Sequence, residues 1–469
     1  MGHNHRGRAA AAGVAVTVER AAWLRAAASA LEHAAGELVP LAARETRLPE
    51  LPRLHAELDR TAFQLRLFGH TLTDGEFLCA TVDHADPHWE MGARPDLRRM
   101  VVPIGPVLVF AAGNFPFALS VAGHDTAAAL AAGCPVVVKA HPGHPELSVR
   151  TGEILVDALT WAGAPPNIVA VICETEAGVA ALRHEEIAAA SFTGSVAGGR
   201  ALFDIAAARP RPIPFYGELG SLNPVLVTPG AVRARGPEIA AGYVSSFTLG
   251  AGQFCTKPGL LLLPEGHGLT GTLRAAVAAT HGQPMLDDRI AEGYHATLAG
   301  LRDDPATEVI SAPDAVADTV EPTLLRVTAD EFVAAAPQLR TECFGPSSLI
   351  VEYTDTTSIH RVLAALEPAL TATIHAEDTE YDTIRPLLPT LTRLAGRLVW
   401  NGWPTGITLT WAQQHGGPYP ATTTTSMGPA AIDRVLRPVA WQEFPDALLP
   451  PALRDANPWD LLRRIDGKR

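Results

Sequence analysis

Hydrophobic residues recur every three or four positions in the first part of the chain, which is the spacing of an amphipathic helix. The pattern runs from about residue 16 to residue 72 and includes Val18, Ala21, Leu24, Ala28 and Leu31. Pro49 and Pro52 interrupt it and predict two helices. Between residues 73 and 100 the period is lost, and Asp, His, Pro and Trp accumulate. This stretch predicts irregular connections or a protruding hairpin that would suit oligomer contacts.

Short apolar runs then alternate with Ala-rich helical stretches. The predicted strands are 101–112, 134–139, 168–172 and 188–192, and helices are expected at 117–133, 146–163 and 177–184. Strands that alternate with helices at this spacing predict an α/β fold with a Rossmann-like, doubly wound parallel sheet that is covered on both faces. Such a sheet is a nucleotide-binding architecture.

The second half of the chain repeats this alternation. A helix is expected at 237–250, and strands are expected at 260–263, 324–327, 349–353 and 397–400. We therefore expect a second α/β domain that begins near Glu218.

Composition narrows the class of protein. The chain has 469 residues, of which 47% are hydrophobic and 19% are charged, enough for two or three domains with a large core. A net charge of −13 without clustered Lys and Arg argues against nucleic-acid binding. The sequence contains no uncharged apolar run of about 18 residues, so no membrane span is expected. Five widely spaced cysteines without a CxxC pair predict a reducing compartment, with the cytoplasm as the expected location, and neither disulfides nor a metal site.

Cys255 is the candidate nucleophile. It lies in Gly252-Gln253-Phe254-Cys255-Thr256, at the end of an apolar run that resembles a helix. A thiol attacks a carbonyl well only as the thiolate, so it needs a nearby base. Glu218, in Glu218-Leu219-Gly220, is the candidate base. The alternative for an isolated cysteine is a small buried hydrophobic residue.

Three further motifs are weak when each is taken alone. Asn114 follows a predicted strand and either donates its amide to a developing oxyanion or forms a turn. Lys139 closes a strand and either binds a ribose or phosphate or is an ordinary exposed lysine. Gly194 and Ser195 lie in a turn between a strand and a helix, which suits a pyrophosphate. The segment Glu342-Cys343-Phe344-Gly345-Pro346 by itself indicates only a turn.

The order of these motifs resembles that of the aldehyde dehydrogenase superfamily over about residues 100–402. The resemblance implies that Cys255 adds to an aldehyde to give a thiohemiacetal, whose oxyanion is held by the Asn114 side chain and the Cys255 N–H. It also implies that hydride transfer leaves a thioester and that Glu218 activates water to hydrolyse it. The implied fold has a cofactor-binding domain (1–217), a catalytic domain (218–402) and a C-terminal segment (403–469) that returns to the cofactor domain and the oligomer interface. A homo-oligomer, either a dimer or a tetramer, is implied by the same analogy.

The resemblance also assigns residues to the cofactor. Lys139 and Glu342 match the positions that hold its two riboses, and Phe344 matches an aromatic residue near the nicotinamide ribose. Gly194 and Ser195 match the turn on the pyrophosphate side, and Gly220 matches backbone that approaches the nicotinamide closely.

Departures from the family pattern bear on cofactor choice. Pro142 stands where many NAD-preferring relatives carry a glutamate, and His141 or Lys139 could offer positive charge or a donor to a 2′-phosphate. NADP is therefore expected, although NAD stays possible because Val196 stands where some NADP-using relatives supply arginine.

The substrate expectation comes from a narrower resemblance. The chain resembles α-ketoglutaric semialdehyde dehydrogenases and NADP-linked fatty-aldehyde dehydrogenases at several places. These are Gly113, Ser221 and the segments 114–116, 122–126, 139–142, 255–259 and 436–450. The expected reaction is oxidation of α-ketoglutaric semialdehyde to 2-oxoglutarate, and the alternative substrate is a long-chain aldehyde. A CoA-acylating or noncatalytic paralogue is disfavoured because the cysteine, the asparagine and the glutamate are all present.

Overall fold

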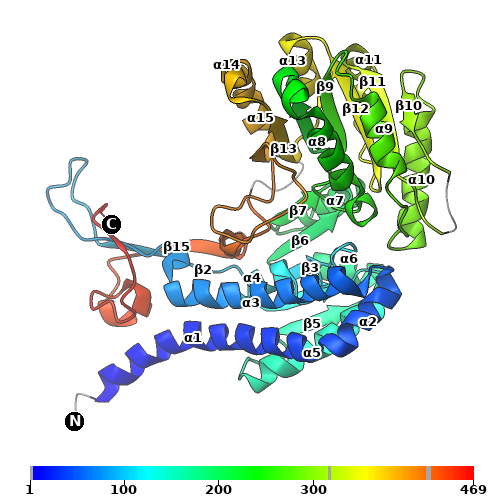
Figure 1. The fold of residues 1–469 in the computed structure, drawn as a ribbon. Coiled ribbons are helices and arrows are strands. Elements are labelled where there is room, and N and C mark those ends of the chain that lie inside the picture. Colours follow the sequence, from blue (N-terminus) through cyan, green and yellow to red (C-terminus); the bar gives the residue numbers. More distant parts are fainter. Residues whose placement is uncertain (1–3, 315–317, 419–423, 469) are drawn as a thin grey trace.

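The computed structural model describes residues 4–314, 318–418 and 424–468, arranged as two large sheets and a smaller projecting one (Figure 1). Three helices open the chain: α1 (Asn4–His33), α2 (Ala35–Thr46) and α3 (His55–Asp74). The predicted break at Pro49 and Pro52 is confirmed, and a further break near Ala34 separates α1 from α2. Helix α1 packs on α3 and on α5 (Pro145–Trp161), so this layer covers one face of the first sheet.

The first sheet is parallel and has the strand order β5 (Val169–Ile172), β4 (Val136–Lys139), β3 (Val107–Phe110), β6 (Ala189–Gly194), β7 (Phe215–Leu219). The connecting helices are α4 (His124–Ala132), α5, α6 (Thr175–Arg183) and α7 (Val196–Ala207). This confirms the doubly wound α/β prediction. The order reverses at β3, and the crevice outside the carboxyl ends of such strands is the usual ligand site.

The single strand predicted over 101–112 is wrong. The chain forms β2 (Leu97–Pro103) and β3, which belong to different sheets. Gly105 lies between them with a φ of 126°, and a Cβ there would lie 2.8 Å from Ala188 Cβ, so the turn requires glycine. The proposed domain boundary between residues 217 and 218 falls inside β7, whose strand ends at Leu219.

The second sheet has the order β10 (Glu308–Ser311), β11 (Thr323–Thr328), β12 (Ser347–Tyr353), β9 (Leu260–Pro264), β8 (Pro224–Val227), β13 (Ala369–His375), β14 (Ala395–Trp400). Its pairings are parallel except for that of β10 with β11. Its helices are α8 (Pro229–Thr248), α9 (Thr270–Ala278), α10 (Asp288–Arg302), α11 (Ala329–Ala334), α12 (Ala336–Leu339), α13 (Thr356–Ala365), α14 (Tyr381–Ile384) and α15 (Leu388–Leu394). The second α/β unit is confirmed, although the sequence pattern did not reveal β8, β10 or β13.

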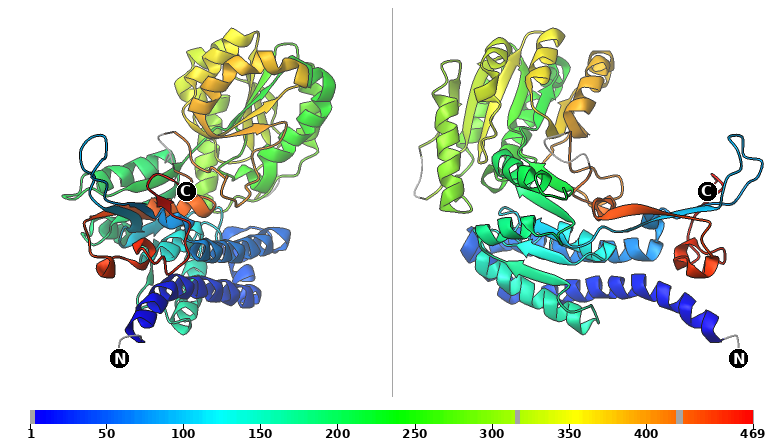
Figure 2. Two further views of the ribbon diagram at one scale, coloured as in Figure 1. Left: turned by 90° about the vertical axis from the view of Figure 1, so that its left-hand side faces the viewer. Right: turned by 180° about the vertical axis from the view of Figure 1, so that it is seen from behind.

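The third sheet projects away from the two large ones (Figure 2). It has the order β15 (Leu436–Gln442), β2, β1 (Thr81–Asp83), β16 (Arg464–Ile465), and β15 pairs with β2 along its whole length. The hairpin expected within 73–100 is thus present, and the C-terminal segment returns to it. Within the described ranges, no helix is both long and apolar enough to cross a membrane.

Candidate active site

Cys255 lies in a turn after a short 3₁₀ helix (Leu249–Gly252) rather than at the end of a continuous helix. Gly252 has a φ of 66°, and a Cβ there would lie 2.2 Å from the carbonyl oxygen of Gly345, so only glycine fits. The buried Asn223 side chain donates from Nδ2 to the carbonyl oxygen of Cys255 at 2.8 Å and to that of Lys257 at 2.9 Å. The backbone that carries the thiol is therefore fixed from both sides.

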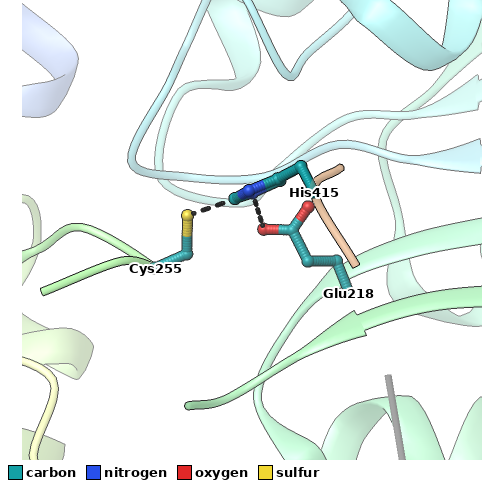
Figure 3. A group of neighbouring side chains, drawn as sticks. All are labelled: Glu218, Cys255 and His415. Carbon is teal, nitrogen blue, oxygen red and sulfur yellow. Dashed lines mark hydrogen bonds and ion pairs between the residues drawn. The ribbon is translucent and has the colours of Figure 1, made fainter. Parts of the chain in front are cut away.

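The thiol faces a buried glutamate and a buried histidine (Figure 3). His415 Nε2 lies 2.9 Å from Glu218 Oε1 and 3.5 Å from Cys255 Sγ. Ser426 Oγ donates to the second oxygen of Glu218 at 2.7 Å. Glu218 comes from β7 of the first sheet, Cys255 comes from the loop before β9, and His415 comes from the chain after β14. The site therefore forms where three distant segments meet.

The electrostatics of this cluster favour a carboxylate beside a neutral thiol. Burial by itself raises the pKa of Glu218, but His415 and the hydrogen bonds from His415, Ser426 and Cys255 outweigh it, so the pKa is lowered. Burial, and then the negative charges of Glu218 and Glu342, raise the pKa of Cys255 well above its usual value. The cysteine is therefore a resting thiol that donates to an adjacent base.

The ligand atoms of Glu218, Cys255 and His415 also lie within 4.8 Å of one another, a spacing at which three such groups could hold a metal ion. Both Glu218 oxygens already accept hydrogen bonds from protein groups. The expectation of a metal-free site stays a prediction.

Asn114 lies close to the cysteine loop. Asn114 Nδ2 donates to the carbonyl oxygen of Gln253 at 2.9 Å. The carbonyl oxygen of Asn114 in turn accepts a hydrogen bond from Arg53 Nη2 at 2.9 Å. The Arg53 guanidinium stacks on Phe115, 4.5 Å from the ring centroid, and lies 5.7 Å from that of Phe254. Asn114 is thus held beside the turn that precedes the thiol, as a candidate oxyanion donor requires.

Residues expected to hold a dinucleotide lie at the carboxyl edge of the first sheet. Lys139 ends β4 and Gly194 ends β6. Ser195 is the N-cap of α7, and its Oγ accepts from Gly198 N at 3.2 Å. These positions sit on both sides of β3, where the strand order reverses. The edge therefore offers a cation and an open helix N-terminus, which fit a pyrophosphate and a ribose.

Glu342 and Phe344 lie in a turn that approaches this edge from the second sheet. A Cβ on Gly220 would lie 2.2 Å from Glu342 Oε2, so glycine is what lets the carboxylate pack on the backbone after Glu218. Burial raises the pKa of Glu342 to about 7, against the opposing effects of Lys257 and of the Ser221 N–H. A half-buried carboxyl group with few protein partners fits a ligand hydroxyl.

The surroundings of His141 favour a neutral ring over a positive charge. Its ring stacks on His144, with centroids 5.4 Å apart, and burial lowers its pKa to about 3. Its Nδ1 faces the N–H of Gly143 at 3.1 Å, and its Nε2 faces Arg289 Nη2 at 3.4 Å. A neutral ring carries one proton and can still accept a hydrogen bond at its other nitrogen. A second ring proton would leave neither nitrogen able to accept, so the neutral ring is favoured. The cations at this place are Lys139 and Arg289, the latter on α10.

Sequence reasoning missed three side chains that build the site. His415 and Ser426 lie in irregular chain without a helical or strand period, and a histidine before Gly416-Gly417 was the only signal. Lys257 is buried, and its Nζ donates to the carbonyl oxygens of Cys343 at 2.6 Å, Gly345 at 3.1 Å and Ser347 at 2.9 Å. Nothing in the sequence pattern indicates that this lysine shapes the turn carrying Glu342.

Comparison with known proteins is consistent with this geometry. The model of the aldehyde dehydrogenase family matches residues 9–437. Alpha-ketoglutaric semialdehyde dehydrogenase 2 from Azospirillum brasilense is 45% identical over 459 residues, covering 96% of this chain and 87% of that protein. Alpha-ketoglutaric semialdehyde dehydrogenase from Acinetobacter baylyi is 40% identical over 458 residues, with the same coverage of 96% and 87%.

Solved structures show the same fold. Glyceraldehyde-3-phosphate dehydrogenase from Methanocaldococcus jannaschii, complexed with NADP, superimposes with a TM-score of 0.75 at 17% identity, covering 91% of this chain and 89% of that one. The chain therefore belongs to the aldehyde dehydrogenase family and is an NAD(P)-dependent oxidoreductase that converts aldehydes to carboxylic acids.

Proposed function

We propose that the protein oxidises α-ketoglutaric semialdehyde to 2-oxoglutarate with NADP, through a thioester on Cys255. The observation that carries the covalent route is the contact of the partly exposed Cys255 thiol with the buried pair Glu218 and His415. The substrate is supported by the two relatives at 45% and 40% identity, which are both alpha-ketoglutaric semialdehyde dehydrogenases.

The first half of the reaction needs a proton acceptor beside the thiol. Because a carboxylate only accepts, His415 Nε2 donates to Glu218, and the carboxylate takes the thiol proton. Cys255 Sγ then bonds to the aldehyde carbon, and the carbonyl oxygen becomes an oxyanion within reach of Asn114 Nδ2. His415 Nε2–H can also stabilise the thiolate at 3.5 Å. When bound, the nicotinamide cofactor accepts the hydride from the former aldehyde carbon.

The second half uses the same carboxylate as a base, after the thiol proton has passed from it to solvent. Glu218 takes a proton from the water that attacks the thioester carbon, the carbon–sulfur bond breaks, and Cys255 regains a proton. Ser426 and His415 hold the two Glu218 oxygens in place for both steps. One carboxylate therefore acts twice while its orientation stays fixed.

The preference for NADP is supported by charge at the end of β4. Pro142 brings no carboxylate that would repel a 2′-phosphate. Burial lowers the pKa of Lys139, and the like charge of Arg289 lowers it further. Arg289 is therefore close enough to Lys139 for the two charges to interact. Glu174 and Glu176 act on Lys139 in the opposite sense. One solved neighbour of the fold is complexed with NADP.

The test is a matrix of initial rates, with reduced cofactor followed by absorbance. NADP and NAD are each tried with α-ketoglutaric semialdehyde, succinic semialdehyde and a long-chain aldehyde, and Cys255→Ser is the control. The proposal predicts the highest kcat/KM for NADP with α-ketoglutaric semialdehyde and no turnover by the variant. A preference for the long-chain aldehyde would overturn the substrate assignment, and an active Cys255→Ser would overturn the mechanism.

We also propose that the protein is a cytoplasmic homo-oligomer that associates through the projecting sheet of β15, β2, β1 and β16. An exposed hairpin carrying Met91 and Trp89 supports this surface. Light scattering on the intact chain is expected to give a dimer or tetramer, and a monomer at micromolar concentration would contradict it.

A further inference from the structure

A polar stripe on α3 and on the helical turn before it (Glu50–Leu54) runs along the segment that carries Asn114. Arg53, Glu57, Arg60 and Gln64 follow one another at helical spacing on this face. Three of them hold the segment directly. Arg53 donates to the carbonyl oxygen of Asn114, Glu57 Oε1 accepts the N–H groups of residues 117 and 118 at 2.8 and 2.9 Å, and Gln64 Nε2 donates to a carbonyl oxygen of residue 118 at 3.2 Å.

Arg60 differs from its neighbours on this stripe. Its Nε contacts Gln64 Oε1 at 3.4 Å, and its Nη1 contacts the carbonyl oxygen of Ile407 at 3.4 Å, both near the outer limit of a hydrogen bond. Arg53, in contrast, forms an ion pair with Glu57. Among the described residues, no carboxylate oxygen lies within ion-pair distance of Arg60. A partly exposed guanidinium held by two weak neutral contacts remains available to a ligand.

The charge of the guanidinium also interacts with the reactive cysteine. Burial lowers the pKa of Arg60, whereas the charges of Glu57 and Cys255 raise it, which places Arg60 within electrostatic range of the thiol. Ile407, which Arg60 contacts, belongs to the chain that runs from β14 to His415 and descends toward α3 (Figure 1). Arg60 therefore stands between the oxyanion segment and the loop that brings the histidine to the site.

Arg397 holds the same loop from the other side. It lies on β14, and its guanidinium donates to the carbonyl oxygens of Pro404 and, at 2.6 Å, of Gly406. Each arginine uses two of its nitrogens, but those of Arg397 make short hydrogen bonds to the loop, whereas both contacts of Arg60 are 3.4 Å long. Of Arg60 and Arg397, whose pKa values both respond to Cys255, Arg60 is held by the weaker contacts and can exchange them for a substrate group.

We propose that Arg60 binds the carboxylate at the far end of the semialdehyde and so determines the preference for short acidic aldehydes. This inference rests on the proposed function. A planar guanidinium pairs with a carboxylate through two parallel charge-assisted hydrogen bonds, which are stronger than the two long neutral contacts they would replace. The carboxylate of α-ketoglutaric semialdehyde is at the opposite end of a five-carbon chain from the aldehyde, so binding by Arg60 directs the aldehyde toward Cys255.

The test compares Arg60→Met and Arg60→Lys with Arg66→Met. Arg66 lies on the same helix and pairs with Glu32 at the surface, so it is a matched control. Each variant is assayed with α-ketoglutaric semialdehyde and with pentanal, which has the same number of carbons and no carboxylate. Inhibition by 2-oxopentanoate, which has the acidic end but no aldehyde, reports binding without turnover.

Arg60→Met is expected to raise KM for the semialdehyde and Ki for 2-oxopentanoate by about 10- to 100-fold, the usual effect of losing hydrogen bonds to a charged group. kcat should stay within about twofold, kcat/KM for pentanal should be unchanged, and Arg60→Lys should restore part of the loss. Equal losses for both aldehydes, or no change in Ki, would overturn the assignment. If the wild-type protein itself prefers pentanal, it is the proposed substrate that fails; if it prefers the semialdehyde and Arg60→Met keeps that preference, only the role of Arg60 fails.

Discussion

Replacing Glu218 by glutamine should make Cys255 more reactive while it stops turnover. The carboxylate oxygen and the sulfur lie within 4.8 Å, so at an effective dielectric constant of about 20 the charge of Glu218 opposes thiolate formation by roughly 3.5 kcal/mol. This corresponds to about 2.5 pKa units before solvent screening, and we expect the pKa of Cys255 to fall by about 2. The hydrolysis step should slow by about 100- to 10,000-fold because its base is lost.

The assay is the rate of alkylation by iodoacetamide as a function of pH, alongside steady-state turnover. A fall of about 2 pKa units raises the thiolate fraction at neutral pH about 100-fold. The lower nucleophilicity of the more acidic thiol reduces that gain to about a tenth, so alkylation should be about tenfold faster. Glu308→Gln, which changes an exposed carboxylate paired with Arg326, is the matched control. Slower alkylation in Glu218→Gln would refute the electrostatic reasoning, and retained turnover would refute the role of the base.

Three further predictions concern the surroundings of the site. Lys257→Met leaves three carbonyl oxygens without their donor and should lower the free energy of unfolding by about 3 kcal/mol and weaken cofactor binding, as measured by denaturant titration and calorimetry, with the exposed Lys468→Met unchanged. Burial raises the pKa of Glu342 to about 7, so the folded state keeps a proton that the unfolded state loses, and the free energy of unfolding falls by at most about 3 kcal/mol as pH rises from about 4.5 to 7. Glu342→Gln should remove this fall. An unchanged pH dependence of Tm in the variant would contradict the prediction. Dialysis against EDTA should leave activity intact because both Glu218 oxygens are hydrogen-bonded to protein; loss of activity that zinc restores would show a metal site at Glu218 and His415.

The fold could be predicted from the sequence because its strands are short apolar runs with clear periods. The sequence pattern did not predict β7, β8, β10, β13, β15 or β16. The error at 101–112 came from Gly105, whose turn lies within an apolar run. Cys255, Glu218 and Asn114 could be placed as candidates because each belongs to a local motif.

The other site residues could not be found because their roles arise from tertiary contacts. His415 reaches the thiol from far along the chain, and Arg60 contacts the loop that leads to His415. Lys257 acts on carbonyl oxygens that any sequence would provide. The role of His141 toward a 2′-phosphate, as a charge or as a donor, stays a prediction; burial, which is not visible in the sequence, lowers the pKa of its ring.

The central claim, that oxidation proceeds through a thioester on Cys255, can be tested by trapping that thioester. Glu218→Gln is mixed with NADP and α-ketoglutaric semialdehyde, quenched in acid within the first turnover, and analysed by peptide mass spectrometry. We expect one equivalent of reduced cofactor per chain and a mass gain equal to the aldehyde less two hydrogen atoms on the peptide that contains Cys255. A modification on another cysteine, or reduced cofactor formed without any acylated peptide, would contradict the account.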